Sequence, residues 1–363
     1  MKPSLRLGAR LVVVLNPRAG RGHGAAALGR AELVLRSAGC TLQVLTTQGP
    51  GHARELLATA PASVLDCDGV VVVGGDGTVH EVVNGLMERR AQGRGEASPP
   101  IGLVPAGSGN SLAADLGLSD AEDAARRIVS GGTRALDVME VQLADPSAAR
   151  RMLYAFNIVG WGLAADAGAR AESLRWLGPR RYALANVLEV LRRRVRPARL
   201  RLLTGERSEE VLEGRYIMAL ASNTQHTGRG LRLAPRARLD DGLLDLLIVP
   251  EMSRRRLIAL MQSVPEGGHL EAPDVRVRQV RAFEVAAGDP GAAAAGTAGD
   301  AGATGDAARR PAPATAVPNH AARLNVDGEI IACAPRSIEV RLLPRALVLL
   351  GAGRADDGTG AMA

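Results

Sequence analysis

Aromatic side chains are scarce in this 363-residue chain, where Phe, Trp and Tyr together make up 2%. Surfaces that stack nucleic-acid bases need such side chains, so their scarcity argues against a nucleic-acid platform. Long apolar runs are lacking as well, and Val70–Val73 and Ala346–Leu350 fall far short of the roughly 20 residues of a membrane-spanning helix. Hydrophobic residues nevertheless make up 46%. The sequence therefore predicts a soluble protein with aliphatic cores, long enough for two domains.

Lysine is nearly absent and cysteine is rare. Lys2 is the only lysine, so the formal charge of +7 rests on arginine, which suits nucleotide phosphates or an anionic membrane surface. The three cysteines form no CxxC pair, which argues against zinc and disulfides and favours a reducing compartment. Leu11–Leu15 is too short for a signal-peptide core. We expect a cytoplasmic protein, and an organelle address would lie upstream of this chain.

The N-terminal part alternates short apolar runs with helical patterns. The runs are typical of buried parallel strands, and Val79, Val82, Val83 and Leu86 lie at helical spacing. Alternating strands and helices predict an α/β domain over residues 1–137 with an open, mostly parallel sheet. The expected strands are Leu11–Leu15, Thr41–Leu45, Val70–Val73 and Ile101–Val104.

From about Asp137 onward, strand patterns predominate, with one long helical stretch at roughly Ala169–Arg194. They predict a second, strand-rich, β-sandwich-like domain over residues 138–351. Within it, 286–322 is rich in Ala, Gly and Pro and predicts a disordered insertion, while 352–363 predicts a flexible tail. The expected strands are Val138–Leu143, Leu153–Val159, Leu200–Leu203, Tyr216–Ala221, Leu243–Val249, Val275–Val285, Arg323–Val326 and Ile338–Leu343.

Three Gly-rich segments each follow an expected parallel strand and open a helix: Asn16–Gly22, Gly74–Thr78 and Pro105–Asn110. Glycines let the backbone approach an anion, and a helix N-terminus offers free N–H groups. One such loop alone is equally well a plain turn. Three loops at the carboxyl ends of parallel strands should converge, and they predict a phosphate site. A Walker A loop is excluded because no lysine is available, and none of the loops has the GxGxxG spacing.

Asp76, in the middle loop, is open to two interpretations. Either Asp76 or Thr78 is the N-cap of the next helix, and Thr78 with Glu81 forms a capping-box pattern. If Thr78 takes that role, Asp76 projects into the cleft. A carboxylate that faces phosphates is costly unless it holds Mg²⁺ or takes a proton from an acceptor hydroxyl. With the Gly-rich loops, this second interpretation predicts phosphoryl transfer.

These motifs resemble the catalytic domain of the diacylglycerol kinase and sphingosine kinase family. Gly74–Thr78 with His80–Leu86 resembles its catalytic motif, and Pro105–Ala113 resembles its second nucleotide loop. Asp240–Asp245 and Val326–Glu329 match motifs of its second domain, so the resemblance runs in order from about residue 11 to 350. The resemblance implies an ATP-dependent, Mg²⁺-using lipid kinase that phosphorylates a lipid hydroxyl presented at a membrane surface.

The resemblance also implies a role for individual positions. Asp76 would be the general base, with Glu329 beside it in the catalytic set. Asp327 would complete the Mg²⁺–ATP site from the second domain. His80, in the first turn of a helix, is left out of the site. The implied nucleotide contacts are Asn16, Pro17, Arg18, Thr47, Gly74, Gly75, Asp76, Gly77, Thr78, Ser108, Gly109, Asn110, Arg175, Arg181, Asp327 and Glu329.

The second domain is implied to hold the lipid, with its acyl chain between sheet and helix. Asp166 is the candidate lipid contact, whereas Gly168 occupies a position where sphingosine kinases carry an aspartate. A sphingoid base is thus only slightly favoured over diacylglycerol. The resemblance further implies a structural Mg²⁺ at Asp241 with the main-chain carbonyls of Arg238 and Leu243, and an acidic surface turn is the alternative.

Several positions have ordinary structural interpretations too. Arg175 and Arg181 suit a solvated helix face, and Asp327–Gly328 suits a hairpin turn. Arg192–Arg194 and Arg254–Arg256 fit either contact with anionic lipid or solvation of helix ends. Two other functions stay open: an NAD kinase-like enzyme, because that class shares the GGDG loop, and a catalytically silent lipid or nucleotide sensor.

Overall fold

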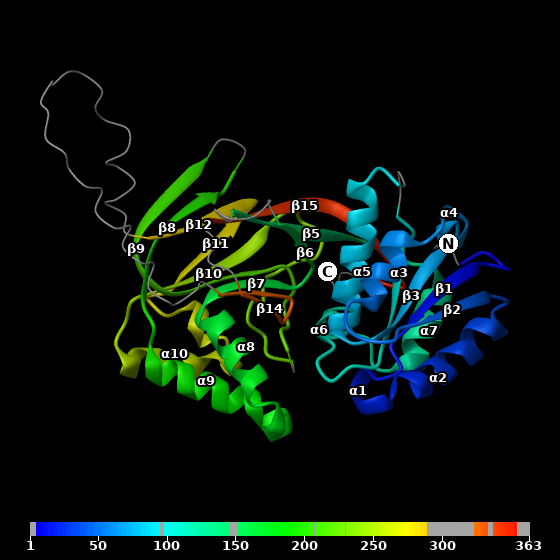
Figure 1. Ribbon diagram of the computed structural model, residues 1–363, viewed down its shortest axis with the longest axis horizontal. Coiled ribbons are helices and arrows are strands. Elements are labelled where there is room, and N and C mark those ends of the chain that lie inside the picture. The colour runs from blue at the N-terminus through cyan, green and yellow to red at the C-terminus, as the bar shows by residue number, and fades with distance from the viewer. Residues whose placement is uncertain are drawn as a thin grey trace, which may run out of the picture.

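The chain folds into two lobes that lie side by side, as the computed structural model in Figure 1 shows. The N-terminal lobe, blue to cyan, combines strands with helices, and the C-terminal lobe, green to yellow, consists mainly of strands. The structure describes residues 5–94, 98–144, 151–205, 208–228, 230–288, 323–332 and 337–353. The predicted insertion lies outside the described residues from 289 onward, and the predicted tail does so from 354 onward.

The N-terminal lobe is built on four parallel strands whose residues are buried on both faces in the centre of the sheet. Alternate residues of one strand reach opposite layers, because successive side chains of a strand point to opposite faces. Val12 and Val14 pack with one pair of helices, and Leu11 and Val13 pack with another pair. In spatial order the strands are β2 (Thr41–Thr46), β1 (Arg10–Leu15), β3 (Gly69–Gly74) and β4 (Ile101–Pro105).

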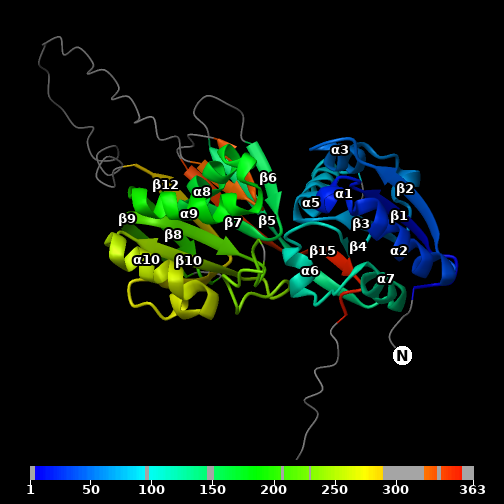
Figure 2. The same ribbon diagram turned by 90° about the horizontal axis from the view of Figure 1, so that it is seen from below.

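Helices cover both faces of this sheet, as the view from below in Figure 2 also shows. Residues of the third and fifth helices pack on one face, and residues of the second and seventh on the other. The helices are α1 (Ala19–Gly22), α2 (Gly24–Ser37), α3 (His52–Thr59), α4 (Ala62–Leu65), α5 (Asp76–Ala91), α6 (Ser111–Asp115) and α7 (Ala121–Ser130).

The C-terminal lobe is a sandwich of antiparallel strands with a helical layer along one side. Its strands are β5 (Thr133–Ala144), β6 (Arg151–Ala155), β7 (Ile158–Gly162), β8 (Arg196–Leu203), β9 (Glu209–Ser222), β10 (Leu244–Pro250), β11 (Arg276–Val280), β12 (Ala282–Ala287), β13 (Arg323–Val326), β14 (Glu329–Ala332) and β15 (Ser337–Leu350). The helical elements are α8 (Leu163–Ser173), η1 (Arg175–Arg180), α9 (Arg181–Arg192), α10 (Arg254–Ser263), η2 (Val264–Glu266) and η3 (Gly268–Leu270).

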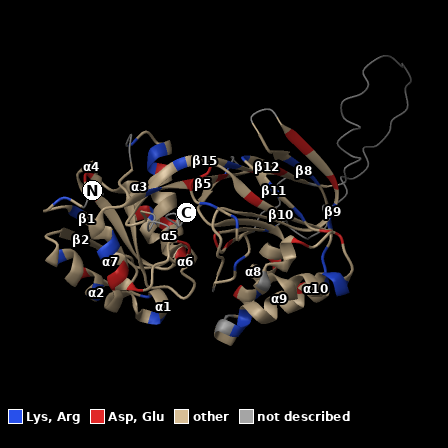
Figure 3. Ribbon diagram, turned by 180° about the vertical axis from the view of Figure 1, so that it is seen from behind, with Lys and Arg blue, Asp and Glu red and all other residues tan. Residues whose placement is uncertain are grey.

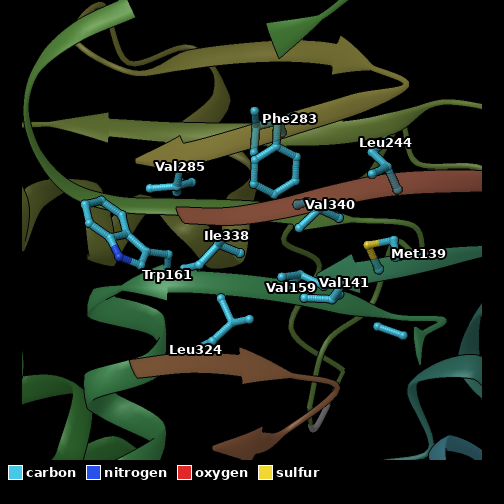
Figure 4. Packing of buried hydrophobic residues seen from close by; sticks show 14 of the residues in the cluster. Met139, Val141, Val159, Trp161, Leu244, Phe283, Val285, Leu324, Ile338 and Val340 are labelled. Carbon is cyan, nitrogen blue, oxygen red and sulfur yellow. The ribbon is translucent and has the colours of Figure 1, made fainter. Parts of the chain in front are cut away.

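The core of the sandwich is almost entirely aliphatic. Figure 4 shows Val141, Ile338 and Val340 packed with two aromatic side chains of this core, Trp161 and Phe283. All five are at most 3% exposed. Burial of such side chains contributes about 1.5–3 kcal/mol each, before the entropy of ordering the chain is counted. The predicted fold class, an α/β domain followed by a strand-rich sandwich, is confirmed.

Two long strands, β5 and β15, run through both lobes and pair with each other along most of their length. On β5, Leu136 packs in the core of the N-terminal lobe, whereas Met139 packs in the sandwich. At the end of β15, Leu349 pairs in parallel with Ile101 of β4. The domain boundary predicted at residue 137 thus falls inside a strand that both lobes share.

Three expectations for the second domain need correction. The single strand expected at Leu153–Val159 is two strands, β6 and β7, which have different partners. The single strand expected at Val275–Val285 is likewise β11 and β12. Helix α10 was not predicted, because Arg254–Arg256 at its start obscures an apolar face of which Leu257 and Leu260 are the buried members. No helix in the described ranges is long and apolar enough to cross a membrane.

Candidate active site

The three Gly-rich loops meet at the carboxyl edge of the parallel sheet, as predicted. Asn16 Nδ2 donates to Thr78 Oγ1 at 2.9 Å, which ties the first loop to the second. A Cβ atom on Gly75 would lie 2.8 Å from the Cα atom of Gly107, so the second and third loops touch through their backbones. A side chain does not fit in such a contact, and glycine is required at both positions.

Asn110 closes the third loop on itself. Its Oδ1 accepts from Gly107 N, and its Nδ2 donates to Gly107 O, both at 2.9 Å. Asn110 also has a left-handed φ of 55°, which asparagine tolerates better than most residues. The side chain predicted to contact the nucleotide therefore shapes the loop, and Gly107, Ser108 and Gly109 are the residues of this loop that line the cavity described below.

Asp76 is the first residue of α5, and its carboxylate caps the neighbouring helix α6. Oδ2 accepts from Ser111 N at 3.0 Å and from Ser111 Oγ at 3.1 Å, and Oδ1 accepts from Leu112 N at 3.4 Å. Burial raises the pKa of the Asp76 carboxyl, although these hydrogen bonds act in the opposite direction. A carboxylate with a raised pKa beside a helix N-terminus is a suitable general base.

The capping box expected from Thr78 and Glu81 is absent. Helix α5 already begins at Asp76, with Gly75 as its N-cap. Glu81 instead reaches α3, where its carboxylate accepts from Gly51 N at 2.8 Å and from Ala53 N at 3.0 Å. Since Thr78 Oγ1 accepts from Asn16, both residues of the pattern join neighbouring loops rather than cap their own helix.

One cavity of about 1020 Å³ joins the two lobes. Its first part lies against the three loops and includes Asp76. Arg18 lines this part too, is exposed, and has no acidic partner among the described residues. Predicted nucleotide contacts that line the cavity are Asn16, Arg18, Thr47, Gly75, Asp76, Gly77, Thr78, Ser108, Gly109 and Asp327.

The second part of the same cavity is apolar. It lies between the sheet strands β7, β9 and β10 on one side and the helical layer of α8, α9 and α10 on the other. This is the place predicted for an acyl chain, between sheet and helix. Its apolar lining consists of Ile158, Leu163, Ala164, Ala167, Met218, Leu220, Leu231, Leu233, Leu247, Val249, Leu260, Met261, Val264 and Val275.

Asp327 of the second lobe also lines this cavity, and its side chain is fully buried. Its Oδ1 accepts from Asn157 N and Ile158 N, and its Oδ2 accepts from Phe156 N and lies near His80 Nδ1, all at 2.9 Å. Because a carboxylate offers about four lone pairs, these four contacts use them all. The Mg²⁺ role of Asp327 stays a prediction, and this geometry does not favour it.

The residue that sequence reasoning missed is His80. Its ring is buried between Asp327 and Glu329 Oε2, which lies 3.7 Å from Nε2. Burial alone would lower the pKa of His80, but the hydrogen bond and charge of Asp327, together with the charges of Glu329 and Glu81, raise it. His80 thereby links α5 of the first lobe to the β13–β14 hairpin of the second. The only sequence signal was its place next to the GGDGT motif.

The Asp327–Gly328 hairpin turn is present, with a left-handed φ of 51° at Asp327 and 95° at Gly328. The structural interpretation of this dipeptide therefore holds, and it also serves the site. The turn directs the Asp327 carboxylate inward between the lobes, whereas Glu329, one residue beyond, has a side chain that is 54% exposed.

Other predicted contacts lie elsewhere. Asp166 faces away from the cavity, because the cavity face of α8 carries Leu163, Ala164, Ala167 and Gly168. Its Oδ2 accepts from Arg196 Nη2 at 2.6 Å, which neutralises the charge proposed for a lipid amine. This placement does not support Asp166 as a lipid contact.

The predicted triphosphate arginines receive little support from the structure. Arg181 donates to the hydroxyl of Tyr182 at 2.9 Å and pairs with Glu172 at 3.7 Å, and it does not line the cavity. Arg175 belongs to η1, but its side chain lies outside the described part of the chain. Pro17 precedes α1 and is likewise not part of the cavity wall.

The predicted structural Mg²⁺ site is a closed turn in this structure. Asp241 Oδ1 accepts from Leu243 N at 3.0 Å, the contact of an acidic turn. The neighbouring Asp240 pairs with Arg134 at 3.1 Å. In the part of the chain that the structure describes, no three His, Cys, Asp or Glu side chains are grouped to hold a metal ion. The predicted donor set of one carboxylate, Asp241, with the main-chain carbonyls of Arg238 and Leu243 is of a different kind and stays a prediction.

A second link between the lobes involves Asp115 at the end of α6. Its carboxylate accepts from Gln225 N at 2.7 Å and from His226 N at 3.1 Å, and His226 Nδ1 lies 2.6 Å from Oδ1. Ser111 Oγ lies 3.4 Å from Gly228 O in the same loop. Asp76, Ser111 and the loop after β9 thus form one connected chain of polar contacts.

Comparison with known proteins agrees with this architecture. Residues 10–141 match the diacylglycerol kinase catalytic domain, and residues 157–351 match the YegS C-terminal NAD kinase beta sandwich-like domain. The chain belongs to the diacylglycerol kinase-like family of lipid kinases.

Individual relatives carry different names within that family. The chain is 30% identical to a diacylglycerol kinase of Mycobacterium tuberculosis, over 76% of this chain and 84% of the relative. It is 28% identical to sphingosine kinase 1 of Arabidopsis thaliana, over 78% of this chain but 64% of that longer protein. A solved structure of a putative diacylglycerol kinase from Bacillus anthracis has the same fold, with a TM-score of 0.67, 20% identity and coverage of 95% and 97% of the two chains.

Proposed function

We propose that this protein transfers the γ-phosphoryl group of ATP to the hydroxyl of a lipid. The observation that carries the proposal is the single cavity, which leads from the Gly-rich loops past Asp76 into an apolar space in the second lobe. A nucleotide at the loops and an acyl chain in the apolar part would bring a phosphate and an alcohol together at Asp76.

The residues supply a consistent route for the reaction. Asp76 takes the proton of the lipid hydroxyl, and the alcohol oxygen forms a bond to the γ-phosphorus. The bond from that phosphorus to the bridging oxygen breaks, and its electron pair leaves with ADP. Backbone N–H groups of the loops and the guanidinium of Arg18, which lines the cavity, would bind phosphate oxygens.

A nucleotide would suit the loop end because Gly75 and Gly107 hold the two loops in backbone contact and place no side chain of their own in front of a phosphate. Mg²⁺ is expected to arrive with the nucleotide, since Mg²⁺ is commonly bound by substrate phosphates and few protein ligands. Asp327 is better placed to orient His80 and the turn at Phe156–Ile158 than to bind a cation.

Two acidic residues of the cavity wall, Glu81 and Asp327, already have hydrogen-bond partners and are not available to pair with a cationic lipid, which favours a neutral acceptor. Glu81 is engaged with α3, and Asp327 is engaged with four partners. Asp166, the candidate partner for a sphingoid amine, is bound to Arg196 outside the cavity. Because burial of an unpaired ammonium is costly, we favour diacylglycerol over a sphingoid base.

The helical layer offers a route for delivery from a membrane. Leu184, Val187 and Leu191 are exposed on one stripe of α9, and Trp176 on η1 is 79% exposed. Figure 3 shows basic residues at the two ends of this layer, where α9 begins and beside α10. The sequence of α10 begins with three arginines, Arg254–Arg256. Since Tyr182 of α9 also lines the cavity, a membrane on this face would lie next to the lipid entrance.

A panel of acceptors with labelled ATP tests the proposal. Diacylglycerol, sphingosine and ceramide in mixed micelles would be compared with NAD under the same conditions. We expect label in diacylglycerol. Label in NAD alone would establish the NAD kinase-like alternative, and nucleotide binding without transfer to any acceptor would favour a silent sensor.

A further inference from the structure

The part of the cavity wall between α8 and the β13–β14 hairpin carries an amide whose donor group has no partner among the residues that the structure describes. Asn325 lies on β13, where its neighbours Leu324 and Val326 point into the sandwich core. Because successive side chains of a strand alternate, Asn325 points to the opposite face, toward α8. It is half-buried and lines the same cavity as Asp76.

The orientation of this amide follows from its one hydrogen bond. Gly328 N donates to Asn325 Oδ1 at 2.8 Å in the hairpin turn. A backbone N–H can only donate, so the atom that receives it must be the oxygen. The NH₂ group therefore projects away from the turn, and within the described ranges it has no acceptor.

Two glycines leave this NH₂ group uncovered. Gly160 of β7 is the register partner of Asn325, and it places no side chain beside the amide. On α8, Gly168 lines the cavity, and a Cβ atom there would lie 3.5 Å from Asn325 Nδ2. The same Cβ atom would lie 2.5 Å from Ile330 Cδ1, so Ile330 occupies the remaining space.

The hairpin that carries this amide touches the helix that carries the reacting carboxylate. Asp327, two residues beyond Asn325, contacts His80 of α5, the helix that begins at Asp76, and both Asn325 and Asp76 line the cavity. A lipid hydroxyl at Asp76 therefore places the adjoining atoms of the same lipid near Asn325. A pair of N–H donors there suits an acceptor oxygen and disfavours an ammonium, which has only donors.

We propose that Asn325 selects lipids that carry an acyl ester next to the reacting hydroxyl, by donating from Nδ2 to the ester carbonyl across the space left by Gly168. This inference rests on the proposed lipid kinase function and narrows its acceptor to acylglycerols. Asn325 acts as a specificity-determining residue, whereas Asp76 acts on the hydroxyl itself.

A pair of lipids that differ only in the carbonyl tests this assignment. The kcat/KM of diacylglycerol would be compared with that of a 1,2-di-O-alkylglycerol of equal chain length in mixed micelles. In the wild type we expect the ester to be favoured about 2- to 10-fold, the worth of one neutral hydrogen bond. In Asn325→Asp the ratio should fall to about one, because the donors are gone.

Asn325→Asp is the informative variant because it keeps an oxygen for Gly328 N and so preserves the turn. Asn325→Ala removes both the hydrogen bond of the turn and the NH₂ donors. If Asn325 has a purely structural role, this variant should lower the kcat/KM of both lipids by the same factor. A second test combines Gly168→Ala, which adds a methyl group over the amide, with Ile330→Val, which removes the Cδ1 atom that would clash with it. This double variant should also lower the ester-to-ether ratio. Asn325→Asp should in addition raise activity toward sphingosine, since it offers a carboxylate to the amine.

The outcomes separate the inference from the function beneath it. An unchanged ester-to-ether ratio in Asn325→Asp, or a change confined to the KM for ATP, overturns the inference alone. A wild type that phosphorylates sphingosine but no acylglycerol also overturns it and leaves the lipid kinase proposal intact. Transfer to no lipid at all overturns both.

Discussion

The two ends of the cavity are built in different ways. At the loop end, the walls are main chain, and Gly75 and Gly107 hold two loops in backbone contact. At the lipid end, the walls are side chains of strands and helices, such as Leu163, Met218 and Leu247. Backbone geometry tolerates few alternatives, whereas aliphatic side chains exchange for one another at modest cost. The loop end therefore specifies phosphate through a short motif, and the lipid end can vary its acceptor without a change of fold.

The largest effect is expected where the two ends meet. Asp76→Asn should reduce turnover about 10²- to 10⁴-fold, the usual contribution of a general base, and should retain nucleotide binding. Turnover and nucleotide affinity would be measured on the same preparation. Near-normal turnover would remove Asp76 from the role, and loss of nucleotide affinity would mean that its contacts with Ser111 and Leu112 chiefly support the loops.

Removal of the Asp166 charge tests whether the lipid end of the cavity depends on the ion pair between Asp166 and Arg196. Asp166→Asn should lower the free energy of unfolding by about 3 kcal/mol, because it leaves the partly buried Arg196 without its counter-charge. The KM for lipid should not change, since Asp166 does not line the cavity. Glu122→Gln is the matched control: it breaks an exposed pair with Arg126 and should cost less than about 1 kcal/mol in urea unfolding. A raised lipid KM in Asp166→Asn would restore its predicted role.

The loop end can be tested by adding one methyl group. A Cβ atom on Gly107 would lie 2.4 Å from Gly75 Cα, so Gly107→Ala should separate the loops and weaken nucleotide binding by about 1–3 kcal/mol. Isothermal titration with ATP measures this. Gly29→Ala in α2 is the control, because no atom lies within 4 Å of its Cβ position and a helical alanine stabilises by about 0.5–1 kcal/mol. Equal affinity in both variants would contradict a backbone-built phosphate site.

The smallest effect concerns pH. Asp76 must be ionised to act as a base, and burial raises its pKa. As the pH is lowered, activity should therefore be lost at a higher pH than in an enzyme whose catalytic carboxyl has an ordinary pKa. The Ser111 hydroxyl bond lowers that pKa, and Ser111→Ala removes it. The acid limb of kcat should therefore move to higher pH in Ser111→Ala. A limb that stays in place would show that another group controls the acid side.

The sequence was sufficient for features that local chemistry determines. The alternation of apolar runs and helices predicted the parallel sheet, and the convergence of its three loops followed from that topology. The hairpin at Asp327–Gly328 also follows from residues that accept left-handed backbone angles.

Features that depend on contacts between distant parts of the chain could not be predicted from the sequence. His80 belongs to the site only because the hairpin of residue 327, 247 positions away, turns its carboxylate toward it. The pairing of Asp166 with Arg196, 30 positions later and away from the cavity lining, could not be predicted from the local sequence. The long strand patterns at 153–159 and 275–285 continued across points where the chain changes partners, and an apolar pattern does not record the partner.

The pairing of β15 with β4 has a consequence for biosynthesis. The parallel sheet of the first lobe is completed by residues near position 349, which leave the ribosome only after almost everything described above has been made. Until then, the edge of β4 at Ile101 lacks that neighbour, and unpaired edges invite association with other chains. We therefore expect the nascent first lobe to remain incomplete throughout translation and the two lobes to acquire stability together.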